Sequence, residues 1–225
     1  MAGTMSEGST DVGRGLWVKP SVAVAAALGW TTLALQFYLS MRLSIARGKG
    51  LLGGLTIYFS FFTILTNILA VLALTAPLVR PRWSLARFFT RPGVNTCIAT
   101  SIAVVGITYT LLLQHLWHPT GVQLVADMLL HHLMPVLFMA YWWVAVPGDD
   151  LRWGQVSRWT FYPVMYFMYA MVRGALSGDY PYPFIDADAL GYRRALGNAS
   201  GILLEFVAVA LLLVAVGRVK DKRAP

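Results

Sequence analysis

The chain has 225 residues, of which 57% are hydrophobic and only 12% are charged. A composition this apolar excludes an ordinary soluble domain of that size and indicates an integral membrane protein. The formal net charge of +8 does not indicate nucleic-acid binding, because the basic residues stand at the ends of apolar stretches, where they set membrane topology.

The first nineteen residues (1–19) are rich in Gly, Ser and Thr, and we expect them to form a disordered N-terminus rather than a signal peptide. Six mostly apolar stretches follow, each of about 18 residues or more, which is the length that crosses roughly 30 Å of hydrocarbon. We predict membrane-spanning helices near Ser21–Met41, Gly54–Ala76, Val94–Gln114, Leu124–Val146, Trp159–Ser177 and Ala199–Gly217. The predicted fold is therefore all-α, one bundle of six transmembrane helices over 20–217, with a basic tail at 218–225.

The basic residues predict the orientation of this bundle. Six spans place both termini on one side of the membrane, and twelve of the 18 lysines and arginines then lie on that side, against five on the other. Because cytoplasmic loops carry the excess of Lys and Arg, we expect both termini in the cytoplasm and a location in a bacterial inner membrane. The second connection, 77–92, carries Arg80, Arg82, Arg87 and Arg91 and is expected to contact anionic lipid head groups.

The fifth connection, 178–186, has the sequence Gly-Asp-Tyr-Pro-Tyr-Pro-Phe-Ile-Asp. Its two prolines cannot continue a helix, and its aromatic residues suit the membrane interface. Two interpretations stay open: an anchor at the interface, or a rim over a site between the helices.

Cysteine and histidine usage argues against a metal centre. The lone Cys97 excludes an intrachain disulfide and a cysteine-rich metal site, and we expect it to pack within the third span. His115 and His118 flank Trp117 at the outer end of that span and are expected to be interface residues. We therefore predict no metal, no cofactor and no nucleic-acid partner.

Polar groups inside two of the spans are the candidate functional site. The second span contains Thr63 within Phe-Phe-Thr-Ile-Leu-Thr-Asn, and the fourth contains His131 and His132, with Asp127 one helical turn earlier. Such groups are costly in hydrocarbon and are functional candidates by default. A hydroxyl and an imidazole together suggest a nucleophile and its base. At 1.5 Å per residue, Thr63 lies about 13 Å and His131 about 10 Å below the outer surface.

Several neighbours leave alternatives open in the second and fourth spans. Thr66 is a second hydroxyl one turn from the first. Asn67 could orient Thr63, stabilise an oxyanion or join two helices. Asp127 precedes His131 by four residues and could hold the second imidazole nitrogen.

Two charged residues also fall in the outer half of the membrane. Arg173 and Glu205 could form an ion pair between the fifth and sixth spans. Alternatively, Arg173 could bind a substrate carboxylate, since its guanidinium matches that geometry.

These motifs carry a family resemblance. The six-span layout, the 61–67 stretch and the Leu-Leu-His-His-Leu-Met-Pro stretch at 129–135 resemble the bacterial Pr-six-Pr family of membrane proteins. That family is similar to the eukaryotic androgen-induced-gene and androgen-dependent-inhibitor proteins, intramembrane threonine hydrolases of fatty acid esters of hydroxy fatty acids. The resemblance covers roughly 20–217 and includes Tyr-Pro-Phe-Ile-Asp at 182–186, which resembles a Tyr-Pro-Phe-Leu-Glu segment.

The resemblance implies roles for individual residues. Thr63 matches the catalytic threonine, which follows a bulky apolar residue in the family motif. The catalytic histidine falls on His131, with Asp127 where the relatives have Asn. The spacing from histidine to proline is one residue shorter here, so His132 stays an alternative base.

Two functions therefore remain open at this point. One is hydrolysis of a lipidic ester drawn from the bilayer, with a Thr nucleophile and a His base. The other is a non-enzymatic role, as a small transporter or lipid-binding bundle that uses the His, Arg and Glu side chains as a relay.

Overall fold

A computed structural model describes residues 8–79 and 83–222, with side chains for 19–79 and 83–220. Arg80, Arg82 and Arg223, which belong to the predicted basic segments, lie outside the described residues. Within the described ranges the chain is helical and contains no strand. The α-helices are α1 (Gly8–Ala46), α2 (Gly50–Phe59), α3 (Phe62–Thr75), α4 (Ser84–Phe89), α5 (Pro92–Thr108), α6 (Gly121–Met128), α7 (Met134–Ala145), α8 (Val156–Trp159), α9 (Phe161–Ser177), α10 (Ala187–Leu190) and α11 (Tyr192–Lys222).

Shorter helical turns complete the chain. Two of them are π-helical, η2 (Tyr109–Leu113) at the end of α5 and η3 (Leu129–Leu133) between α6 and α7. The 3₁₀ turns are η1 (Ala76–Leu78), η4 (Trp153–Gln155) and η5 (Pro183–Ile185).

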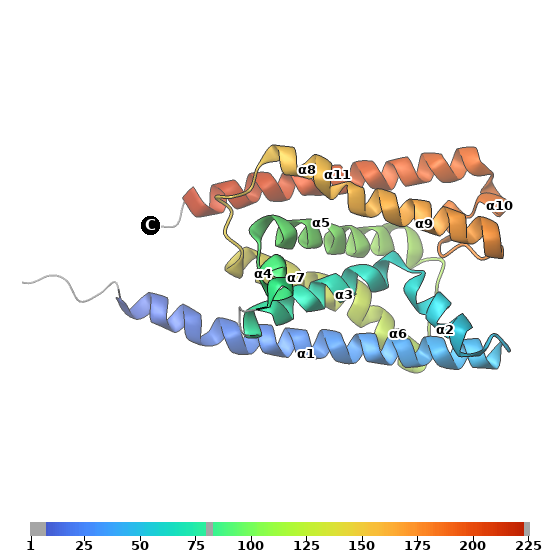
Figure 1. The fold of residues 1–225 in the computed structure, drawn as a ribbon, viewed down its shortest axis with the longest axis horizontal. Helices are drawn as coiled ribbons and strands as arrows, with labels where there is room; N and C mark the ends of the chain where they lie inside the picture. Colours follow the sequence, from blue (N-terminus) through green and yellow to red (C-terminus); the bar gives the residue numbers. More distant parts are fainter. Residues whose placement is uncertain (1–7, 80–82, 223–225) are drawn as a thin grey trace, which may run out of the picture.

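The helices form an elongated bundle around α5. In Figure 1, α1 runs along one side, α9 and α11 run along the opposite side, and α3, α5 and α7 lie between them. Helix α5 packs against α3, α7 and α11. The core between these helices is apolar, and its fully buried side chains include Leu74, Ile102, Phe138 and Phe206.

The apolar helices identify an integral membrane protein by length and composition. Four helical segments are long and apolar enough to cross a membrane: Lys19–Ala46, Pro92–Leu113, Gly121–Ala145 and Tyr192–Lys220. The bent pair Gly50–Phe59 and Phe62–Leu78 makes a fifth if it counts as one span. Each of these overlaps a predicted span. The sixth prediction, Trp159–Ser177, corresponds largely to α9, which has 17 residues and is not among them.

The first long helix starts at the end of the bundle where the last long helix finishes. Helix α1 begins at Gly8, within the segment predicted as a disordered N-terminus. The start of α1 and the end of α11 lie at the same end of the bundle in Figure 1.

The second predicted span is broken, whereas the sequence predicted a continuous helix over Gly54–Ala76. Helices α2 and α3 meet at an angle of 74°. Phe61 has an extended backbone (φ −93°, ψ 130°), and the carbonyl of Ser60 accepts a hydrogen bond from the Tyr166 hydroxyl at 2.8 Å. The break therefore places Thr63 in the first turn of α3, where amide groups have no partner within the helix.

A glycine brings the central helix close to the turn that carries the predicted base. A Cβ atom at Gly106 would lie 3.3 Å from the carbonyl oxygen of His131. The missing side chain thus allows α5 to pack directly against η3.

Candidate functional site

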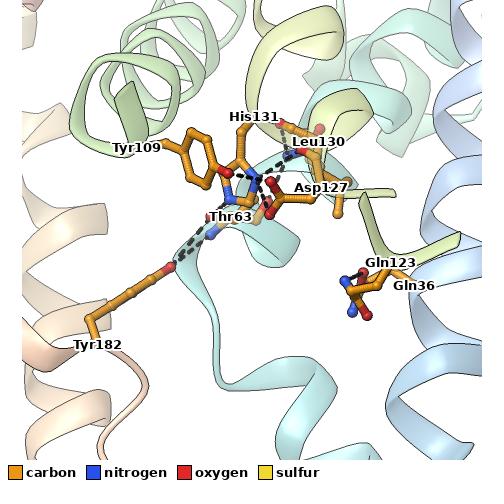
Figure 2. Close-up of polar contacts among 9 residues, drawn as sticks. Gln36, Thr63, Tyr109, Gln123, Asp127, Leu130, His131 and Tyr182 are labelled. Atoms are coloured by element: carbon orange, nitrogen blue, oxygen red, sulfur yellow. Dashed lines mark hydrogen bonds and ion pairs between the residues drawn. The ribbon is translucent and has the colours of Figure 1, made fainter. Parts of the chain in front are cut away.

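The predicted nucleophile and base meet inside the bundle. The Oγ1 of Thr63 lies 3.3 Å from the Nε2 of His131, although the two residues come from α3 and η3 (Figure 2). Thr63 is buried, with 6% of its surface exposed. The structure therefore brings together the two groups that the sequence placed at similar depth.

Asp127 holds the other side of the imidazole. The Nδ1 of His131 lies 3.0 Å from the backbone oxygen and 3.2 Å from the Oδ1 of Asp127. Both atoms are acceptors, so Nδ1 carries the proton and Nε2 presents its lone pair to Thr63. Asp127 is itself buried.

Tyr109 supports both members of this pair. Its hydroxyl donates a hydrogen bond to Oδ2 of Asp127, as Figure 2 shows. Its ring stacks on the His131 imidazole, with centroids 4.0 Å apart and planes at 17°. The hydroxyl therefore binds the carboxylate oxygen that does not contact His131, and the ring fixes the plane of the imidazole.

The π-helical turns explain how these side chains reach one another. Tyr109 begins η2 and His131 lies within η3. A π-turn inserts an extra residue into a helix and changes the direction of the side chains that follow it, which is why such turns recur at functional sites.

Asn67 joins the helix of the nucleophile to the turn of the base. Its Nδ2 donates to the backbone oxygen of Thr63 at 2.8 Å and to that of Leu130 at 3.3 Å. The amide is fully buried and contacts the backbone, not the Thr63 hydroxyl. Of the alternatives for Asn67, the geometry favours a link between α3 and η3 over an oxyanion donor.

Tyr182 reaches Thr63 from the 178–186 segment. Its hydroxyl oxygen accepts from the Thr63 amide at 3.3 Å and lies 3.4 Å from the Thr63 Oγ1. The ring stacks on Phe184 and meets Phe61 edge-on. The segment therefore forms a rim over the site, which was one of its two predicted roles.

Two cavities meet at Thr63. Cavity A, of about 180 Å³, lies among α3, α5, α9 and α11 and includes Val105, Leu203 and Phe206 in its wall. Cavity B, of about 390 Å³, lies on the α1 side and includes Asp127 and His131. Thr63, Leu113 and Tyr182 line both cavities.

The alternative hydroxyl and imidazole lie apart from these cavities. The Oγ1 of Thr66 is 3.0 Å from the hydroxyl of Tyr162, and Thr66 is fully buried. His132 meets the Tyr109 ring edge-on at 5.3 Å. Neither residue lines cavity A or cavity B, so the geometry favours Thr63 and His131.

The predicted ion pair between the fifth and sixth spans is wrong. Within the described residues, Arg173 and Glu205 do not pair with each other. Arg173 donates to the backbone oxygen of Asp179, and Glu205 accepts from the Thr108 hydroxyl at 3.2 Å. Arg173 caps the following connection because the Asp179 carbonyl lies within hydrogen-bonding distance of its guanidinium, whereas Glu205 does not. Arg173 lines neither cavity.

The tyrosines are the site residues that the sequence reasoning missed. Tyr109 lines cavity B and Tyr166 lines cavity A. Both lie inside predicted spans, and a phenolic hydroxyl buried in hydrocarbon requires a hydrogen-bond partner. That requirement could have identified these tyrosines from the sequence. In the described part of the chain, His, Cys, Asp and Glu form no group of three or more that could hold a metal ion.

Fold and site together define an all-helical integral membrane protein with a buried Thr–His–Asp–Tyr arrangement between two cavities. Comparison of the chain with protein-family models, curated proteins and solved structures gave no match.

Proposed function

We propose that the protein is an intramembrane hydrolase of lipidic esters, with Thr63 as the nucleophile and His131 as the general base. The observation that carries the proposal is the 3.3 Å contact between Thr63 Oγ1 and His131 Nε2, on an imidazole whose Nδ1 faces two acceptor oxygens of Asp127. Nucleophile, base and orienting acid within hydrogen-bond reach are the signature of nucleophilic catalysis.

The first half of the reaction transfers the acyl group to the protein. Thr63 Oγ1 attacks the ester carbonyl carbon, and its proton moves to Nε2 of His131. The imidazolium that forms is stabilised by Asp127, whose second oxygen stays bonded to Tyr109. The bond from carbon to the alcohol oxygen then breaks, and the alcohol leaves with the proton from Nε2.

The second half releases the acid. A water molecule gives a proton to Nε2 of His131 and attacks the acyl-threonine carbon. The bond to Thr63 Oγ1 breaks, and that oxygen recovers the proton, so threonine and histidine return to their starting states.

The negative oxygen that forms in each half requires donors beside Thr63. The Tyr182 hydroxyl lies there, 3.4 Å from Thr63 Oγ1, and the Thr63 amide in the first turn of α3 donates to it. The positive N-terminal end of a helix favours an anion, and donors fixed in advance near the reacting carbon lower the barrier most.

The expected setting is the bilayer, with membrane lipids as neighbours and a fatty acid ester as substrate. Fatty acid esters of hydroxy fatty acids are the substrate class that the resemblance implies. A topology of six spans with both termini in the cytoplasm belongs to the same proposal, because it places Thr63 in the outer half of the membrane.

The decisive experiment measures fatty acid release from a branched lipid ester by purified protein in detergent. Thr63→Ala is expected to reduce the rate to background and His131→Ala to reduce it about 10²–10⁴-fold, while Thr63→Ser retains activity. Thr66→Ala is the matched control, since that hydroxyl bonds to Tyr162, and it should stay active. Equal release by the wild type, Thr63→Ala and His131→Ala would exclude the proposal.

One observation supports the non-enzymatic alternative. The α2–α3 break leaves free helix ends inside an apolar segment, and broken helices are common at transporter binding sites. Labelling by a serine-hydrolase activity probe that is lost in Thr63→Ala supports the enzyme. Proton-coupled flux in vesicles without such labelling supports transport.

A further inference from the structure

We infer that the two cavities separate the two halves of the substrate: cavity A takes the acyl chain, and cavity B takes the alcohol, which is uncharged and carries hydrogen-bonding groups. This inference rests on the proposed hydrolysis and specifies its substrate class.

The position of Thr63 is the first step of the argument. Thr63 is one of three residues, with Leu113 and Tyr182, that belong to both cavity walls. An ester whose carbonyl carbon is attacked by Thr63 therefore has a space on each side of the reacting bond. The neighbours of Thr63 divide in the same way, since Phe62 lines cavity A and Phe61 lines cavity B.

The position of the base decides which half enters which cavity. The departing alcohol oxygen must receive its proton from Nε2 of His131, so the alcohol has to lie on the imidazole side of the carbonyl. His131, Asp127 and Tyr109 line cavity B, and none of them lines cavity A. The acyl chain, which exchanges no proton, is left to extend into cavity A.

The chemistry of the two walls agrees with this division. Cavity A is walled largely by apolar side chains from four helices, among them Val104, Val105, Phe167, Leu203 and Phe206. These side chains match an acyl chain, which gains only from burial away from water.

Cavity B contains polar groups suited to an alcohol. Gln36 on α1 and Gln123 on α6 line the same cavity as Asp127 and meet each other in Figure 2, with Gln123 Nε2 donating to Gln36 Oε1 at 3.0 Å. Ser40 also lines this wall. Paired amides retain free donors and acceptors for hydroxyl or amide groups of a ligand.

The charge of cavity B argues for a neutral alcohol. No Lys or Arg is among its described wall residues, while the Asp127 carboxylate is. A carboxylate brought into this space would meet like charge without a cation to pair with. A glycerol ester therefore suits cavity B better than the ester of a hydroxy fatty acid whose carboxylate enters with it.

The test measures kcat/KM with two ester series. One varies the acyl chain of a monoacylglycerol from octanoyl to stearoyl. The other keeps palmitate and varies the alcohol: glycerol, an alkyl alcohol, or a hydroxystearate. We expect the wild type to prefer glycerol to both other alcohols.

Two substitutions probe the cavities separately, each with a matched control. Ala199→Leu fills cavity A and is expected to change the octanoyl-to-palmitoyl preference by at least about tenfold in favour of octanoyl, leaving the alcohol preference unchanged. Ala208→Leu is the same change at an exposed position of α11 and should change neither. Gln123→Leu is expected to reduce the preference for glycerol over the alkyl alcohol about threefold to tenfold. Gln114→Leu, outside both cavities, should have no such effect.

Failure of the inference differs from failure of the proposed function. If Thr63-dependent hydrolysis occurs but Ala199→Leu alters the alcohol preference, or the wild type prefers the hydroxystearate ester, the division is wrong and the enzyme stands. If no ester is hydrolysed in a Thr63-dependent manner, both proposals are wrong.

Discussion

At the scale of single residues, the support of the imidazole is the feature that most affects the proposed chemistry. A carboxylate beside a histidine keeps the ring in one tautomer and one plane and stabilises the imidazolium that forms. Here Asp127 fixes the tautomer through Nδ1, and Tyr109 fixes the carboxylate through its hydroxyl and the plane through its ring. Tyr109 is therefore a positioning residue that acts through Asp127 and His131.

Replacing Tyr109 with Phe keeps the stacked ring and removes the hydroxyl. We expect kcat to fall about tenfold, the cost of one hydrogen bond to a charged group, with KM nearly unchanged, since the hydroxyl bonds to Asp127. Asp127→Asn should cost more, about 10²–10⁴-fold in kcat, because an amide that donates to Nδ1 leaves the proton on Nε2. Steady-state kinetics on purified variants check both values.

Tyr141→Phe is the control for this pair of variants. Tyr141 lies on α7, is partly buried and packs at the edge of the core, so its loss reports the general cost of removing a buried phenol. If Tyr109→Phe and Tyr141→Phe have equal effects, or if Tyr109→Phe changes KM alone, the positioning role is wrong.

At the scale of elements, the break between α2 and α3 determines what the Thr63 side chain can do. In a continuous helix the Thr63 amide would bond to a carbonyl four residues earlier. After the break it faces the Tyr182 hydroxyl, at the positive end of α3. The element that carries the nucleophile thus also positions the phenol that the proposed mechanism uses for the negative oxygen.

Tyr182→Phe tests this arrangement. The variant keeps the aromatic ring and removes the hydroxyl donor beside Thr63, so we expect kcat to fall about 10²–10³-fold while substrate affinity is little changed. Tyr162→Phe loses a hydroxyl that bonds to Thr66 instead, and it should retain most activity. A Tyr182→Phe protein as active as Tyr162→Phe would show that the phenol is no oxyanion donor.

The break and the π-turns also show where sequence reasoning stops. The apolar length of each segment predicted the spans, because hydrocarbon thickness sets that length directly. The stretch from Tyr58 to Phe62 contains no Pro or Gly, the usual causes of a kink. Its break is stabilised by Tyr166 on α9, a tertiary contact that no local pattern encodes.

The same distinction applies to the site. Equal depth along two helices predicted that Thr63 and His131 could meet, and the i, i+4 spacing predicted Asp127 as the partner of His131. The stacking of Tyr109 on His131 depends on two π-turns in different segments. The position of Tyr182 beside Thr63 depends on the path of a loop, because Tyr182 lies 119 residues after Thr63 in the chain. Neither follows from helical periodicity.

At the scale of the whole molecule, an ion pair links two interhelical segments that are far apart in the sequence and lie at one end of the bundle. Lys49 lies between α1 and α2, and Asp179 follows α9. The Lys49 ammonium donates to the Asp179 carboxylate at 2.9 Å. This hydrogen bond, with the nearby charges of Lys49, Arg173 and Arg47, holds the pKa of Asp179 below its ordinary value, although partial burial opposes the shift.

The lowered pKa fixes how this pair should respond to pH. Because the carboxylate is more acidic in the folded state, its contribution is complete above the unfolded pKa of about 3.9 and is lost as pH falls through the lower folded value. Both side chains are about half exposed, so Asp179→Asn should cost only about 0.2–1 kcal/mol at pH 7.

Thermal unfolding in detergent measures this difference. The stability gap between wild type and Asp179→Asn should narrow as the pH falls below the unfolded pKa of about 3.9, and it should shrink in high salt. Asp188→Asn removes an exposed carboxylate that forms no ion pair within the described residues and should leave stability unchanged at either pH. A gap that persists in acid would contradict the ion-pair explanation.

The number of membrane crossings is the remaining question at this scale, and it depends on α9. Helix α9 alone is short, but α8 precedes it with only Thr160 between them. Together, residues 156–177 extend about 33 Å at 1.5 Å per residue, enough to cross the hydrocarbon. The tyrosines of α9 lower its apolar character, and one of them bonds to Ser60 at the break. In Figure 1, α8 and α9 run alongside α11. We therefore predict that this segment is a sixth span.

Cysteine labelling decides between five and six spans. In a Cys97→Ala background, a membrane-impermeant maleimide should label Thr120→Cys and Asp188→Cys in intact cells, and Gly154→Cys only after permeabilisation. All three positions are exposed, and a Cβ at Gly154 would meet no atom within 4 Å. Gly154 and Asp188 flank the α8–α9 segment, so labelling of both from the same side would mean that it does not cross. With an odd number of spans, the start of α1 and the end of α11 would lie on opposite sides of the membrane. In the structure, however, they lie at the same end of the bundle. Labelling of Gly154→Cys and Asp188→Cys from opposite sides would mean that the segment crosses the membrane. The resulting even number of spans agrees with the position of the start of α1 and the end of α11 at one end of the bundle.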